Sequence, residues 1–217
     1  MAVITISRQV GTHGARIARA LAQELGYEFA DKSLINKVIR QYGLTRLNLI
    51  YDRKPKIWEL FDENSTATIE MMNQTIAAIA ARGNVVILGR GGYRVLADMA
   101  DVLNVFVRAT DAARARRVGK RDELGAAEAA ELVKADDELR ARFVRLFYGA
   151  DWADESAYDL VVDTSDTPDA EAVAQIVEAL QARPAAAGDA RQAAHLTVDP
   201  VLADTVDKAL ADRAAKD

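Results

Sequence analysis

The sequence contains no cysteine and only two histidines, His13 and His195. Disulfides and thiolate metal sites are therefore excluded, and a histidine-based zinc site is disfavoured. Long hydrophobic runs are missing as well, because an uncharged stretch such as Val85–Leu88 is far too short to cross a bilayer. The chain does not begin with a basic segment followed by an apolar one, as a signal peptide would. These absences predict a cytoplasmic protein with no membrane partner.

An excess of basic charge is also missing. The chain has 28 basic and 33 acidic residues among 217, which gives a net charge of −5. This balance argues against a nucleic-acid polymer as a partner, although it leaves room for a local cluster of arginines. Half of the residues are hydrophobic, and the length is sufficient for one substantial α/β domain with a well-buried core.

The most distinctive pattern that is present occupies the first 26 residues. Val3–Ile6 is an uncharged β-branched run, typical of a strand buried on both faces. Gly11 and Gly14 interrupt it, and from Ala15 apolar residues recur at helical spacing up to Gly26, where a helix cap is expected. A strand, a glycine-containing loop and a helix that opens from the loop favour anion binding, because backbone N–H groups converge at the helix start. The alternative is an ordinary strand-to-helix turn.

Four more strands are expected, separated from one another by helical patterns. They occupy residues 27–30, 85–88, 103–107 and 159–163. Alternating strands and helices predict an α/β fold with a five-stranded parallel sheet flanked by helices. We expect one domain over residues 1–183, followed over residues 184–217 by a linker, Pro184–Gly188, and a tail helix. The apolar stripe of this helix either docks back on the domain or meets a second subunit in a homodimer.

Two features near these strands allow two interpretations each. Asp31 follows the second strand, where it either caps the next helix or contacts a substrate. Leu44–Asn64 mixes aromatic and basic residues, so this long segment either covers a substrate or packs Trp58 and Phe61 into the core.

Basic residues gather after the third and fourth strands. Arg90 lies among glycines at the sheet edge where open α/β folds bind ligands, and an arginine on a flexible turn is the alternative. Six basic residues follow the fourth strand, namely Arg108, Arg114, Arg116, Arg117, Lys120 and Arg121. A helix that begins directly after a strand presents one face over the same edge. Its arginines are therefore expected to bind phosphates, and an ordinary solvent-exposed helix face is the alternative.

Several segments, taken in this order, resemble the cytidylate kinase-like family of nucleoside monophosphate kinases. They are ITISRQVGTHGARIARALAQELG, Asp31-Lys32, VVILGRGGY, VFVRATDAARARRV, DELRARF and DWADESAYDLVVDTS. The resemblance covers the chain from Val3 to about Leu180 and leaves the tail after Arg183 uncovered. It implies a P-loop kinase fold with a helical lid. It also implies transfer of the γ-phosphoryl group of ATP to CMP or dCMP with Mg²⁺.

The resemblance, together with the loop and the basic run, assigns expected roles to individual residues. The residues expected to hold ATP are Gly11, Thr12, His13, Gly14, Ala15 and Arg121. Those expected to face the acceptor nucleotide are Asp31 and Arg90. Those expected to act in catalysis are the lid arginines Arg114 and Arg117, and Asp137 with Arg140 from the D-x-x-R pair that follows. For His13, a local hydrogen bond within the loop is the alternative to a contact with phosphates.

The loop departs from the phosphate-loop consensus G-x-x-x-x-G-K-[ST] at functional positions. Arg8 stands at the first glycine, Gly14 at the lysine and Ala15 at the metal-binding hydroxyl. Loss of a phosphate-binding cation costs several powers of ten in rate unless another cation replaces it, by analogy with the ~10³–10⁵ effect of an arginine finger. Arg8 and Arg16, which flank the loop, are the expected replacements in catalysis. The alternatives are a surface ion pair for Arg8 and a solvent-facing position for Arg16.

Three functional hypotheses remain open from the sequence. The first is an ATP- and Mg²⁺-dependent kinase of CMP or dCMP. The second is a kinase of another small phosphate or hydroxyl compound, since Leu88 and Gly91 occupy places that are acidic in cytidylate kinases. The third is a nucleotide-binding regulatory protein with little turnover. The sequence leaves the metal ligand unassigned among Asp31, Asp137 and Asp163.

Overall fold

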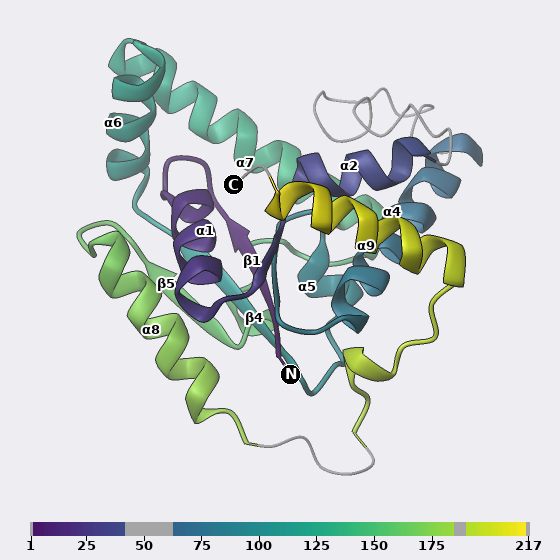
Figure 1. Cartoon of the computed structure of the whole chain (residues 1–217). Coiled ribbons are helices and arrows are strands. Elements are labelled where there is room, and N and C mark those ends of the chain that lie inside the picture. The colour runs from purple at the N-terminus through teal and green to yellow at the C-terminus, as the bar shows by residue number, and fades with distance from the viewer. Residues whose placement is uncertain (1, 42–62, 185–189, 216–217) are drawn as a thin grey trace.

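The computed structural model describes residues 2–41, 63–184 and 190–215. At its centre is a parallel sheet of five strands in the order β2-β3-β1-β4-β5 (Figure 1). The strands are β1 (Val3–Arg8), β2 (Glu28–Ala30), β3 (Val85–Leu88), β4 (Val102–Arg108) and β5 (Leu160–Asp163). The predicted α/β fold with its five parallel strands is confirmed.

Helices cover both faces of this sheet. One face carries α1 (Gly14–Leu25) and α8 (Asp169–Ala182). The other carries α2 (Lys32–Gln41), α4 (Glu63–Ala81), α5 (Gly92–Val95) and α9 (Pro200–Ala214). A helical pair, α6 (Asp111–Asp122) and α7 (Ala126–Tyr148), stands at the upper left of Figure 1, near the start of α1. Two single-turn helices, η2 (Glu155–Ala157) and η3 (Ala193–His195), complete the described elements.

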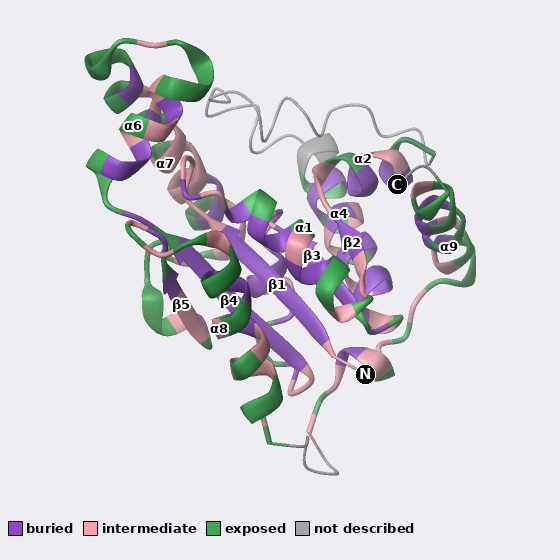
Figure 2. Cartoon of the chain, turned by 60° about the vertical axis from the view of Figure 1, so that its left-hand side comes forward, coloured by how far each residue is buried: buried purple, intermediate pink, exposed green. Residues whose placement is uncertain are grey.

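The two faces of the sheet enclose separate hydrophobic cores because successive strand residues point to opposite sides. On β1, Val3 belongs to the core under α2, α4 and α9, whereas Ile4 and Ile6 belong to the core under α1 and α8. β1, β3 and β4 are therefore buried along most of their length, as Figure 2 shows. This double coverage explains the uncharged β-branched runs in the sequence.

The first strand is longer than expected. The sequence pattern ends the strand at Ile6, but β1 continues to Arg8, which pairs with Val107 of β4 in the parallel ladder. The charged residue is accommodated because it lies at the carboxyl edge of the sheet, where the loop to α1 begins. Arg8 is thus positioned by a strand and not by a loop.

The tail helix α9 docks back on the domain. Its apolar residues Leu202, Val206, Ala209 and Leu210 are buried in the core shared with α2 and α4. Of the two alternatives for this helix, the structure shows docking on the domain and gives no support for a homodimer through its apolar face, which the chain itself covers.

Two expectations concern residues outside the described ones. The first is the interpretation of Leu44–Asn64, of which the structure describes only residues 63 and 64. The second is the linker Pro184–Gly188, of which it describes only residue 184. Among the helices that the structure describes, none is long and apolar enough to span a membrane.

Candidate functional site

The loop between β1 and α1 offers backbone donors for an anion. Within the described part of the chain, the N–H groups of Gly11, Thr12 and His13 donate to no protein acceptor. Gly11 has a φ of +79°, and a Cβ at this position would lie 2.8 Å from the backbone oxygen of Arg114. Only glycine therefore lets the loop lie this close to α6.

Three side chains hold the loop in place: one from the loop itself, one from just after β5 and one from α6. The Thr12 hydroxyl donates to the Gln9 oxygen over 2.8 Å, and the Thr164 hydroxyl donates to the Thr12 oxygen over 3.0 Å. Arg117 of α6 donates to the backbone oxygens of Gly11 over 3.3 Å and of Thr164 over 2.6 Å. Thr12 is fully buried by these contacts, so it supports the loop from behind and does not line the cavity in front of it.

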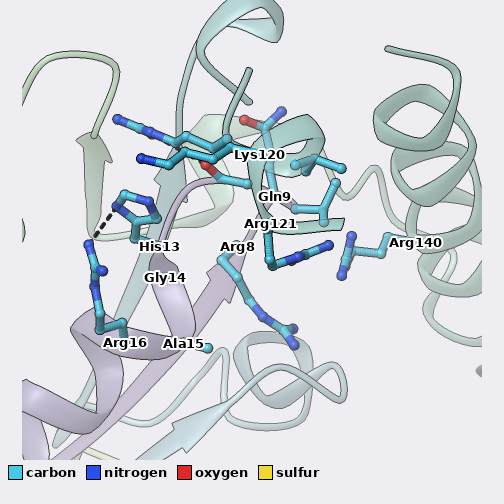
Figure 3. A pocket seen from close by; sticks show the side chains of 13 residues that line it. Arg8, Gln9, His13, Gly14, Ala15, Arg16, Lys120, Arg121 and Arg140 are labelled. Carbon is cyan, nitrogen blue, oxygen red and sulfur yellow. Dashed lines mark hydrogen bonds between the residues drawn. The ribbon is translucent and has the colours of Figure 1, made fainter. Parts of the chain in front are cut away.

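A cavity of about 640 Å³ opens in front of the loop (Figure 3). Five of the six residues expected to hold ATP line it, namely Gly11, His13, Gly14, Ala15 and Arg121. Its cationic lining residues are Arg8, Arg16, Arg117, Lys120, Arg121 and Arg140. The described lining includes neither a carboxylate nor a hydroxyl side chain. A polyanion such as a triphosphate suits this cavity by charge.

A second, much narrower cavity adjoins the carboxyl ends of β1 and β3. Its volume is about 20 Å³, and three arginines line it, Arg8, Arg90 and Arg140. Arg90 is only 1% exposed and has a φ of +57°, and its Nη2 donates to Oδ1 of Asn36 over 3.1 Å. Arg8 and Arg140 line both cavities, so two guanidinium groups lie where the two cavities meet.

Arg16 takes part in a surface network at the start of α1. Its side chain is 67% exposed, and it forms an ion pair with Asp169 of α8. His13 lies in the same network, with Nδ1 3.1 Å from Oδ1 of Asp169 and 3.0 Å from Nη2 of Arg16. The hydrogen bond from Arg16 to Asp169 raises the pKa of Arg16. Burial alone would raise the pKa of Asp169, but Arg16 and His13 outweigh burial and lower it.

The expected lid residues Arg114 and Arg140 form separate ion pairs, Arg114 with two carboxylates and Arg140 with one. Arg114 is 2% exposed and donates to Asp137 over 3.0 Å and to Asp111 over 2.6 Å. Burial alone would lower the pKa of Arg114, but these two carboxylates raise it. Arg140 pairs with Asp136 on its own helix. Arg114 and Asp137 thus join α6 to α7 outside both cavities, whereas Arg140 reaches both.

Asp31 lies outside both cavities, and its partners include Leu34, Arg213 and, at 3.9 Å, Arg19. Its Oδ1 accepts from the N–H of Leu34 over 3.1 Å, so the expected capping of α2 is confirmed. Arg213 of α9 donates to both carboxylate oxygens, over 2.8 and 2.9 Å. Burial alone would raise the pKa of Asp31, but the hydrogen bonds from Arg213 and Leu34 outweigh burial and lower it.

Sequence reasoning missed several lining and supporting residues. Lys120 shares the cavity-facing side of α6 with Arg117 and Arg121, and spacing of three and four residues along the basic run could have revealed it. Asn36 is a polar residue on an otherwise apolar helix face, and this break in the pattern could have indicated a buried polar contact. Trp152 of the narrow cavity gave no comparable signal.

The model of the cytidylate kinase-like family matches residues 3–166. The chain belongs to this family. A cytidylate kinase of Ignicoccus hospitalis is 34% identical over 166 residues, which are 76% of this chain and 91% of that protein. A cytidylate kinase of Methanothrix thermoacetophila is 28% identical over 166 residues, 75% of this chain and 88% of that protein. The family match ends before α8, so neither α9 nor Arg213 lies within it.

Solved structures confirm the P-loop kinase fold. An uncharacterized protein from Eubacterium ventriosum superposes with a TM-score of 0.68 at 18% identity, over 84% of this chain and 100% of that one. A gluconokinase from Sinorhizobium meliloti gives a TM-score of 0.53 at 15% identity, over 83% and 91% of the two chains. A shikimate kinase from Bacteroides thetaiotaomicron gives 0.51 at 16% identity, over 83% and 98%.

The donor set around the larger cavity does not fit a protein-held magnesium ion, which prefers carboxylate and other oxygen ligands. In the portion of the chain that the structure describes, no three histidine, cysteine, aspartate or glutamate side chains come together as metal ligands. The three aspartates considered from the sequence accept from protein donors instead: Asp31 from Arg213, Asp137 from Arg114 and Asp163 from Ser165. We therefore assign no catalytic step to a metal.

Proposed function

We propose that the chain transfers the γ-phosphoryl group of ATP to a small anionic acceptor. The observation that carries this proposal is that Arg8 and Arg140 line both cavities. A phosphoryl group transferred at the side of the larger cavity next to the narrow one is within reach of both guanidinium groups. These groups neutralise the charge that develops on the transferred oxygens.

In this proposal the larger cavity holds the triphosphate of ATP. The N–H groups of the β1–α1 loop bind the phosphates from one side, and Arg117, Lys120 and Arg121 of α6 bind them from the other. An oxygen of the acceptor forms a bond to the γ-phosphorus, the bond to the β–γ bridging oxygen breaks, and ADP leaves. Arg90 in the narrow cavity holds the anionic group of the acceptor close to this point.

CMP or dCMP is our first choice of acceptor, because the curated relatives are cytidylate kinases and their similarity covers most of both chains. One observation supports a different phosphate or hydroxyl acceptor as the second candidate. Asp31, which the resemblance places at the acceptor, is held by Arg213 and lies outside both cavities. An acceptor that needs no carboxylate on the protein satisfies this arrangement better.

The test is transfer of labelled γ-phosphate from ATP to a panel of nucleoside monophosphates and small hydroxyl compounds. Arg140→Met removes one of the two shared cations and is expected to lower kcat/KM by roughly 10³-fold. Arg116→Met is the matched control, because Arg116 is exposed on α6 and lines neither cavity. ATP binding without transfer to any acceptor would overturn the kinase proposal and favour a nucleotide-binding regulatory protein.

A further inference from the structure

Two of the departures from the phosphate-loop consensus, Arg8 and Gly14, lie side by side in the structure. In the consensus loop the first position is glycine and the seventh is lysine, whereas here the first is Arg8 and the seventh is Gly14. A Cβ built on Gly14 would lie 2.6 Å from Cβ and 2.9 Å from Cγ of Arg8. The aliphatic part of Arg8 therefore occupies the space in which any side chain at position 14 would have to begin.

The other end of the Arg8 side chain lies against Gly89, just after β3. A Cβ on Gly89 would contact Nη1 and would lie 3.4 Å from Cζ of Arg8, although this flexible end of the side chain can shift more easily than its Cβ. Gly89 also has a φ of +74°, which favours glycine independently. Glycines thus border both ends of Arg8, and its guanidinium reaches the junction of the two cavities.

The charge of Arg8 remains available to a ligand. Its half-buried side chain makes no hydrogen bond or ion pair within residues 2–41, 63–184 and 190–215. By contrast, Arg16 pairs with Asp169 and Arg121 pairs with Asp122. Arg117 donates to the backbone carbonyls that hold the loop.

We propose that Arg8 is the phosphate-binding cation of this loop, and that position 14 is glycine because Arg8 needs its space. The two departures are then a single exchange, in which the cation moves from the start of the helix to the end of β1. This inference rests on the proposed function, since it assumes that phosphates occupy the larger cavity.

An arginine at this place has a chemical consequence. A lysine ammonium is a point charge, whereas a guanidinium presents several N–H donors in one plane and can bind two oxygens at once. Arg8 lines both cavities, so it can contact the transferred phosphoryl group and the acceptor anion together.

The decisive experiment is a cycle of four chains: wild type, Arg8→Gly, Gly14→Lys and the double variant that restores the consensus pair. Each single variant is expected to lower kcat/KM by at least 10²-fold, the first by losing the cation and the second by steric conflict with Arg8. The double variant is expected to be at least tenfold more active than either single variant. A double variant no better than the worse single one overturns the proposal.

A second arm keeps the test independent of how well Arg8→Gly folds. Arg8→Met retains an unbranched side chain beside Gly14 but has no charge, and it is expected to lower kcat/KM by about 10³-fold. Wild-type activity in Arg8→Met overturns the proposal, as does a larger loss in Arg16→Met than in Arg8→Met.

A third experiment tests only the packing of Arg8 on Gly14 and needs no enzymatic activity. Gly14→Ala is expected to lower the midpoint of urea unfolding in wild type and to have a clearly smaller effect when Arg8 is glycine. Equal effects in the two backgrounds overturn the exchange. If wild type neither binds nor hydrolyses ATP and transfers to no acceptor, the proposed function fails, and this third experiment separates that failure from the packing of Arg8 on Gly14.

Discussion

Replacement of Arg213 by alanine is expected to weaken the docking of α9. The Arg213 and Asp31 side chains are 19% and 18% exposed, and two hydrogen bonds of 2.8 and 2.9 Å join them. Removing one partner of a fully buried pair costs about 3–5 kcal/mol, and exposed pairs contribute about 0–1 kcal/mol. The pair is partly exposed, and Asp31 keeps its bond from the N–H of Leu34. We therefore expect the free energy of unfolding to fall by about 2 kcal/mol.

The same pair gives the variant a characteristic pH dependence. The pKa of Asp31 is lowered in the folded chain, so its contribution to stability is present above the ordinary aspartate pKa of about 3.9. That contribution is lost as the pH falls through the lower, folded pKa. The difference in unfolding free energy between wild type and Arg213→Ala should therefore be constant near neutral pH and should shrink below about pH 4.

Urea unfolding followed by far-ultraviolet circular dichroism measures both effects. Lys208→Ala is the matched control on the same helix, because the Lys208 and Asp204 side chains are 71% and 61% exposed. This control should cost no more than about 0.5 kcal/mol. Equal losses in Arg213→Ala and Lys208→Ala, or a difference that persists unchanged to about pH 3, would refute the reasoning.

Three further predictions follow from the site. Gly11→Ala should cost at least about 2 kcal/mol and weaken ATP binding, because its Cβ would lie 2.8 Å from the Arg114 oxygen at a φ of +79°. Asp137→Asn should lower the free energy of unfolding by about 2 kcal/mol, because Arg114 is only 2% exposed but keeps its ion pair with Asp111. Asp111→Asn is its control and should cost much less, since Asp111 is 89% exposed. Removal of Mg²⁺ with EDTA should not weaken ATP binding, because the described cavity lining has no carboxylate or hydroxyl ligand.

Each of these three predictions has a clear contrary result. An unchanged urea midpoint and ATP dissociation constant in Gly11→Ala would contradict the close approach of the loop to α6. Similar losses in Asp137→Asn and Asp111→Asn would show that burial of the ion pair is not what matters. A tenfold weaker binding of ATP in EDTA, measured by titration calorimetry, would contradict this prediction.

The sheet was predictable because its strands are buried on both faces. Runs such as Val3–Ile6 and Val85–Leu88 carry no charge, and the helices between them show a clear apolar stripe. The clustering of basic residues at one edge also followed, since the carboxyl ends of parallel strands lie together. Arg90 and Arg117 were found in this way, and both line a cavity.

Pairings between distant parts of the chain were not predictable. Asp31 and Arg213 lie 182 positions apart, and nothing local to Asp31 indicates that a tail helix will bind it. The family resemblance also placed Asp137 with Arg140 in a D-x-x-R pair, whereas Asp137 of α7 contacts Arg114 of α6. Such contacts depend on how helices pack, which single-sequence periodicity does not specify.

His13, which stands at the second glycine of the consensus, has a different compensation from the one proposed for Arg8 and Gly14. His13 has a φ of +61°, a conformation that costs a residue other than glycine about 1–2 kcal/mol. Its side chain recovers part of that cost, because Nδ1 lies 3.1 Å from Asp169 of α8. A substitution in such a loop can thus be offset by another helix, as for His13, or by the end of the preceding strand, as we propose for Gly14. A missing consensus lysine is therefore weak evidence of lost activity until the space around its position has been inspected for another cation.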